Sequence, residues 1–146
     1  MKNNQEKDMN IPDDLKYYEN HQWVKIIDDI TVICGVTDYF QDNTGEIILV
    51  EFINNVLRSD VETGEKIAIV ESTKESIDIK AIASGQIIEI NRALEESPDL
   101  LNTDPYGEGW IYKIEVEDIT MIENIIEPDE YLDIILGEDL FEEDTL

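Results

Sequence analysis

Residues 70–79 have the sequence VESTKESIDI, and this stretch decides the fold. It joins two apolar segments, residues 66–70 and 77–82, that are rich in β-branched side chains. Such segments are typical of strands, and the polar residues between them predict a hairpin connection. The hairpin turn places Lys74 in water, in a chain with only 10 basic residues against 36 acidic ones. A solvated turn lysine is the simplest interpretation, and the surrounding sequence decides whether it is more than that.

Short β-rich segments alternate with turn signals on both sides of this hairpin, from about residue 17 to residue 116. The turn signals include residues 43–45, 62–64 and 84–85. Short strands at such spacing predict a mainly β domain with a sandwich or barrel-like architecture. Within it, short helical turns are expected at residues 37–44 and 92–101.

The hydrophobic period changes after residue 117. Isoleucines then recur at helical spacing behind Asp118, which suits an N-cap. A second helix is predicted to begin at Pro128 and to end at Gly137. We therefore expect helices over about residues 118–137 that pack on the β core, with a partner-binding amphipathic helix as the alternative.

The chain divides into one domain and two ends. Its 146 residues suffice for a single domain with a sizeable core. Residues 1–14 are polar and expected to be flexible, residues 15–137 form the domain, and residues 138–146 form an acidic tail. No run of residues is long enough to span a membrane. The N-terminus has neither the apolar stretch of a secretory signal nor the arginines of a transit peptide, which predicts a cytoplasmic location.

Composition limits the chemistry that the chain's own side chains can supply. A formal net charge of -26 repels phosphate, which argues against nucleic acid or an anionic membrane as a partner and favours partners with basic surfaces. Cys34 is the only cysteine, and its apolar surroundings predict a buried, inert thiol. His21 is the only histidine and is expected to be structural, beside Trp23. We therefore predict no metal site and no catalytic residues, so that any reaction depends on an attached group.

Four blocks of the chain resemble, in order and spacing, the H-protein family of the glycine cleavage system, whose members carry lipoic acid on a lysine. The central block is ESTK at residues 71–74, followed by Asp78 and by AIASG at residues 81–85. The other blocks lie at residues 15–24, 35–51 and 97–110. Together they cover most of the chain, from about Leu15 to about Leu136.

The resemblance implies a lipoyl-domain-like β sandwich, a barrel-sandwich hybrid, with C-terminal helices. It also implies that lipoic acid is attached to Lys74 through an amide. Glu71 and Gly85 would then help a lipoate ligase or lipoyltransferase to recognise the hairpin. Biotin carriers use a similar hairpin with Met on both sides of the lysine, so the flanking Thr73 and Glu75 favour lipoate.

By the same resemblance, the chain is a carrier and not an enzyme. It would shuttle an aminomethyl group from glycine decarboxylase (P protein) to aminomethyltransferase (T protein), with dihydrolipoyl dehydrogenase (L protein) as a third partner. In the family the loaded arm folds into a shallow cleft, to which Asn20, Gln22 and Asp78 correspond here. Gln22 stands where the family usually has Glu, and a neutral amide holds a cationic amine less firmly than a carboxylate does.

Two other functions stay open at this point. An H-like protein could act in lipoate relay, the transfer of lipoate to other enzymes, and Gln22 favours that reading. An unmodified acidic interaction module is the remaining alternative. No pair among the 36 carboxylates stands out as a catalytic pair.

Overall fold

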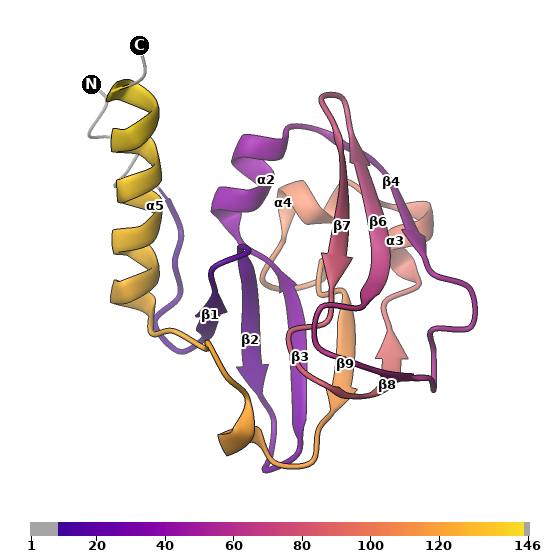
Figure 1. Ribbon diagram of the computed structural model, residues 1–146. Helices are drawn as coiled ribbons and strands as arrows, with labels where there is room; N and C mark the ends of the chain where they lie inside the picture. Colours follow the sequence, from indigo (N-terminus) through magenta and orange to yellow (C-terminus); the bar gives the residue numbers. More distant parts are fainter. Residues whose placement is uncertain (1–8, 145–146) are drawn as a thin grey trace.

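A computed structural model describes the backbone of residues 9–144 and the side chains as far as Gly137. In this part of the chain the strands form two antiparallel sheets (Figure 1). The larger sheet has the order β1 (Lys16–Tyr18), β2 (Gln22–Ile26), β3 (Thr31–Val36), β9 (Tyr112–Glu115), β8 (Gly85–Ile90) and β5 (Asp60–Val61). The smaller sheet has the order β4 (Ile47–Phe52), β6 (Lys66–Ser72) and β7 (Ser76–Lys80). The prediction of a mainly β fold is confirmed, and the described strands do not close into a single barrel.

The two sheets share one core of aliphatic side chains. It includes Val32 and Ile114 from the larger sheet and Ile67, Val70 and Ile79 from the smaller one, all of them almost fully buried. β-branched residues suit this arrangement because they pack well on a pleated surface that is covered on one face. Burial of this apolar surface is the main force that holds the sheets together.

The helical turn predicted at residues 37–44 is confirmed as α2 (Asp38–Thr44). The turn predicted at residues 92–101 is instead two short helices, α3 (Ala93–Glu96) and α4 (Leu100–Thr103). The Thr37 side chain caps α2 by accepting a hydrogen bond from the backbone N–H of Phe40 at 3.2 Å. Figure 1 shows α2 at the same end of the molecule as the turn between β6 and β7.

A second, smaller core lies between the long helix α5 (Pro128–Asp144) and strands β1 and β2. Its rings pack closely: Tyr17 and Tyr131 stack with their centroids 4.8 Å apart. Trp23 lies across Gly35, its register partner on β3. A Cβ at Gly35 would stand 2.6 Å from the indole, so only glycine lets the ring lie there.

The helix predicted behind Asp118 is wrong. Asp118 does act as a cap, since its side chain accepts a hydrogen bond from the backbone of Thr120, but it caps only the 3-10 turn η1 (Ile119–Met121). The chain then extends, and Ile126 pairs with Tyr17 through two backbone hydrogen bonds of 2.8 and 2.9 Å. Pairing with β1 therefore prevails over the helical spacing of the isoleucines.

α5 begins at Pro128 as predicted, but it does not end at Gly137 and continues to Asp144. Glycine ends helices chiefly by adopting a left-handed conformation. Among the described glycines, those with positive φ are Gly45 and Gly64. The backbone of residues 138–144, expected to belong to an acidic tail, is thus helical, and the last two residues lie outside the described part of the chain.

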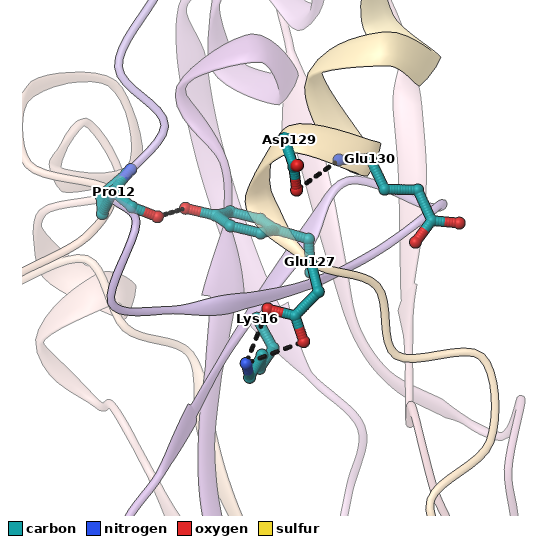
Figure 2. A network of polar contacts seen from close by, with 6 residues as sticks. Pro12, Lys16, Glu127, Asp129 and Glu130 are labelled. Carbon is teal, nitrogen blue, oxygen red and sulfur yellow. Dashed lines mark hydrogen bonds and ion pairs between the residues drawn. The ribbon is translucent and has the colours of Figure 1, made fainter.

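Residues 9–14 were expected to be flexible, yet they are tied to the domain. Tyr17 donates a hydrogen bond to the carbonyl of Pro12 at 2.5 Å. Figure 2 shows this contact beside the ion pair of Lys16 with Glu127, at 2.8 Å, which joins β1 to the segment that leads into α5. The first eight residues, also predicted to be flexible, lie outside the described residues.

Candidate functional site

Lys74 lies in the turn between β6 and β7, and its side chain is exposed, as predicted. Ser72, which is buried, fixes this turn. Its hydroxyl oxygen accepts hydrogen bonds from the backbone N–H groups of Lys74 at 3.0 Å and Glu75 at 3.1 Å. The Ser72 backbone also donates to the Glu75 carbonyl at 2.8 Å. The backbone on both sides of the lysine is therefore held by a residue only two positions away.

The segment after α2 supports the turn from the other side. The Thr73 backbone donates a hydrogen bond to the Glu46 carbonyl at 3.0 Å. Gly45 has a φ of 90°, a conformation that favours glycine. A Cβ there would stand 3.6 Å from the Cε of Lys74 and 3.7 Å from its Cδ, which is van der Waals distance. The methylenes of the lysine therefore pass over Gly45.

The Lys74 amine points at the end of α2. Its Nζ donates a hydrogen bond to the Asn43 carbonyl at 3.2 Å. Carbonyls in the last turn of a helix carry partial negative charge and attract cations. This contact orients the amine while it stays open to solvent, so an incoming enzyme can reach it.

A cavity of about 290 Å³ opens beside this contact. Its lining combines apolar and polar side chains and comes from the turn before β2, from α2 and from β7. The lining residues are Asn20, His21, Tyr39, Phe40, Asn43, Thr44 and Ile77. Because Asn43 both lines the cavity and accepts from the lysine, the amine lies at the edge of this cavity.

His21 forms part of the cavity wall and is anchored to α5. Its Nδ1 lies 2.9 Å from the Tyr131 hydroxyl, which in turn lies 2.7 Å from the Thr37 hydroxyl. The His21 ring also packs against Tyr39, with centroids 4.9 Å apart. The backbone of His21 has a φ of 70°, a conformation uncommon outside glycine. The only histidine of the chain is therefore structural, as predicted, and also faces the cavity.

The three residues expected in an arm cleft are not brought together. Asn20 lines the cavity, whereas Gln22 and Asp78 are not among its lining residues. Asp78 is exposed on β7 and its carboxylate lies 3.5 Å from the Nζ of Lys66.

Gln22 is only 2% exposed and serves the core. Its Nε2 donates to the Lys80 carbonyl at 2.7 Å, and its Oε1 accepts from the Tyr112 hydroxyl at 2.9 Å. Burial raises the pKa of Tyr112 well above its usual value, so the phenol stays a donor. Because Gln22 does not line the cavity, its neutral amide gives no reason to expect a weakened cleft, and the ground on which it favoured lipoate relay falls away.

The two residues expected to guide a ligase occupy different places. Glu71 is half-buried on β6, three residues from Lys74. Gly85 begins β8 in the other sheet, at the opposite end of the molecule from the β6–β7 turn (Figure 1). A Cβ at Gly85 would stand 2.3 Å from the Glu115 carbonyl oxygen, so strand packing accounts for this glycine.

The residues that sequence reasoning missed are mostly on α2. Tyr39, Phe40, Asn43 and Thr44 line the cavity, and the sequence showed them only as a short helical turn. The turn signal at residues 43–45 marked the end of that helix, where the last backbone carbonyls have no hydrogen-bond partner within the helix. This signal could have identified Asn43 as an acceptor for a nearby cation.

The described residues offer no other evident chemistry. Cys34 is fully buried, and burial raises the pKa of its thiol to about 12, which agrees with the predicted inert cysteine. No group of His, Cys, Asp and Glu side chains among them could hold a metal ion. None of their helices has both the length and the apolar character that a membrane span requires.

Comparison with known proteins bears on the whole arrangement. The family model described as glycine cleavage H-protein matches residues 15–137. The glycine cleavage system H protein of Alkalilimnicola ehrlichii is 41% identical over 129 residues, which cover 88% of this chain and 98% of that protein. The protein of the same name from Acinetobacter baumannii is 46% identical over 123 residues, which cover 84% of this chain and 97% of that protein.

A solved structure agrees in fold and in sequence. The crystal structure of a glycine cleavage system H protein from Mycobacterium marinum superposes with a TM-score of 0.74 at 33% identity. The match covers 83% of this chain and 95% of that one. The chain therefore belongs to the glycine cleavage H-protein family and is a non-catalytic component of the glycine cleavage system.

Proposed function

We propose that the chain is a lipoyl-lysine carrier that takes an aminomethyl group from glycine decarboxylase to aminomethyltransferase, with dihydrolipoyl dehydrogenase as the third enzyme that it serves. The observation that carries this proposal is the exposed Lys74 amine on a turn fixed by Ser72, at the edge of a cavity. Family membership supports it, and the geometry supplies what a carrier needs: an accessible amine, a stiff attachment point and a nearby recess.

Attachment converts the ammonium of Lys74 into a neutral amide. Nζ loses two protons and bonds to the carboxyl carbon of an activated lipoyl group, from which the activating group departs. A lysine amine is protonated at neutral pH, so the attaching enzyme has to supply the base. The amide retains one N–H, which the Asn43 carbonyl can still accept.

When bound, the lipoyl group would supply a dithiolane whose S–S bond breaks as one sulfur bonds to the carbon fragment, which brings the electron pair left by decarboxylation, while the other sulfur becomes a thiol. The chain's own residues position and shelter the cargo. Tyr39, Phe40 and Ile77 give the cavity apolar walls that exclude water, and Asn20 and Thr44 add polar groups that can hydrogen-bond a small polar cargo.

The overall charge suits repeated short encounters with several enzymes. A formal net charge of -26 creates a long-range field that attracts partners with basic docking surfaces and speeds their association at low salt. The proposed partners are therefore expected to present Lys and Arg on the surfaces that dock this chain.

Intact mass after incubation with lipoate, ATP and a lipoate–protein ligase tests the attachment site. We expect the wild-type chain and Lys25→Ala, a control at an exposed lysine of β2, to gain the mass of one lipoyl group. Lys74→Ala should gain none. An increment that persists in Lys74→Ala, or its absence from the wild type, would refute the proposal.

Glycine decarboxylation with the other three glycine cleavage components then tests the shuttle. The lipoylated wild-type chain should support turnover, whereas the unmodified chain should not. A lipoylated chain that supports no turnover would leave the carrier role intact but would refute the proposed place in glycine cleavage.

A further inference from the structure

Two adjacent apolar side chains on β4 are turned to solvent. Ile48 is 54% exposed and Leu49 is 39% exposed. Successive residues of a regular strand point to opposite faces, so one of the two would normally be buried. Here the pairing of β4 with β6 shifts register between Ile47 and Leu49, and such a bulge re-aims the side chains beside it. The bulge therefore accounts for the exposure of both.

This pair lies next to the Lys74 turn. Leu49 is the register partner of Glu71 on the neighbouring strand, three residues before Lys74, which corresponds to about 10 Å along the strand. Figure 1 shows the β6–β7 turn projecting beyond the end of β4 where these residues lie. The exposed carboxylates of Glu46 and Glu51 flank the pair along the chain.

We propose that Ile48 and Leu49, with the acidic residues beside them, form the docking surface for the enzyme that acylates Lys74. This inference rests on the proposed function. The bulge of β4 would bind one partner, the lipoate-attaching enzyme. That enzyme would present an apolar patch flanked by basic side chains.

The position of the reacting atom selects this partner. Acylation takes place at Nζ, whose methylene stem passes over Gly45, so the attaching enzyme must bring its active site down onto the hairpin. The enzymes that act later meet the far end of a long arm and need not touch the hairpin so closely. Of the partner enzymes, only the attaching enzyme must contact the surface that lies within about three residues of the lysine.

Charge favours the same assignment. Like-charged partners would be repelled by Glu46, Glu51 and Glu75, all of which are exposed around the pair and the turn. An apolar contact with a polar, charged rim is the usual anatomy of a specific interface. The pair would supply the apolar contact, and the acids would supply orientation and speed of encounter.

Steady-state lipoylation kinetics, with the unmodified full-length chain as the varied substrate, test this surface. The variant is Ile48→Thr/Leu49→Thr, because threonine is polar and has the β-branched shape that a strand prefers. Its matched control is Ile26→Thr/Ile27→Thr, at 42% and 47% exposure on the hairpin between β2 and β3, at the opposite end of the molecule. Thermal unfolding of both variants checks that each is folded.

We expect the β4 variant to raise the KM of the ligase about tenfold, with kcat within twofold of wild type, and the control to leave both unchanged. Once lipoylated at high ligase concentration, the β4 variant should be turned over by dihydrolipoyl dehydrogenase at the wild-type rate. A wild-type KM in the β4 variant, or an equal rise of KM in the control, would refute the proposed docking surface and leave the proposed function standing. Failure of the wild-type chain to be acylated would overturn the proposed function as well.

Discussion

The Lys74 turn and the cavity beside it are built in different ways. Contacts between near neighbours hold most of the turn, since Ser72 binds the backbone of Lys74 and Glu75, and one bond from Thr73 to the Glu46 carbonyl adds to them. The cavity wall at His21 depends on Tyr131, which comes from α5 more than a hundred residues along the chain. A local device thus fixes the attachment point, and a long-range assembly shapes the recess that would shelter the cargo. Variants that strike one region and spare the other should separate attachment from protection.

The largest expected effect on stability belongs to Gln22→Met, which tests whether Gln22 serves the core or the cavity. Methionine has a similar size but cannot pair with the Lys80 carbonyl and the Tyr112 hydroxyl, which would stay buried without this partner. The Tyr112 hydroxyl keeps its bond from the Ile82 backbone and its 3.5 Å contact with the Lys80 carbonyl, but two shorter buried hydrogen bonds are lost. Their loss predicts a decrease of about 2–4 kcal/mol in the free energy of unfolding, measured by urea denaturation.

Gln86→Met is the matched control, because the Gln86 amide also donates to a backbone carbonyl, that of Arg58 at 3.1 Å, but in a half-buried site on β8. The free energy of unfolding of Gln86→Met should fall by less than about 1 kcal/mol. Lipoylation of both variants should match wild type. If Gln22→Met keeps the wild-type stability but loses the carried group faster, Gln22 contacts the cargo in the cavity and does not serve the core.

The turn was predictable from sequence because the information lies within it. β-branched flanks predicted β6 and β7, and the polar residues between them predicted an exposed Lys74. Even the role of Ser72 depends on residues two and three positions away. The helical turn at residues 37–44 was predictable for the same reason, since α2 is capped locally by Thr37.

What sequence could not supply is contact between distant segments. The isoleucines after Asp118 have helical spacing, yet Ile126 pairs with the edge strand β1. The residues next to Ile126 in the sequence do not indicate this pairing. Gln22 was assigned to a cleft by family resemblance, but its position is set by Lys80 on β7 and Tyr112 on β9. The cavity collects residues from three separate elements, so its lining was largely missed.

A smaller effect is expected for Ser72→Ala, which loosens the turn. The buried hydroxyl accepts from two backbone N–H groups, and its removal should cost about 1–3 kcal/mol of stability. A mobile turn presents the Lys74 amine less often in a reactive orientation, so kcat/KM for lipoylation should fall about tenfold. Ser76→Ala, at an exposed site in the same hairpin, is the control and should change neither quantity. Wild-type lipoylation kinetics in Ser72→Ala would show that a preorganised turn is not needed.

The smallest expected effect comes from Tyr131→Phe, which breaks the long-range anchor and leaves the turn intact. Removing the hydroxyl deprives His21 and Thr37 of a partner, at a cost of about 1–2 kcal/mol in the free energy of unfolding. Lipoylation of Lys74 should proceed at the wild-type rate, because every contact that holds the turn is still present.

Protection of the cargo should nevertheless weaken in this variant. Without the Tyr131 hydroxyl the His21 ring loses one of its contacts, so this part of the cavity wall is held less firmly and water gains more access to the carried aminomethyl group. We expect formaldehyde release from the loaded chain to accelerate about threefold over wild type. Tyr18→Phe, on β1, changes a side chain that does not line this cavity but lines a separate pocket, and should release it at the wild-type rate. A loss of lipoylation in Tyr131→Phe that matches its loss of protection would mean that the two regions are coupled, and the separation between attachment and shelter would fail.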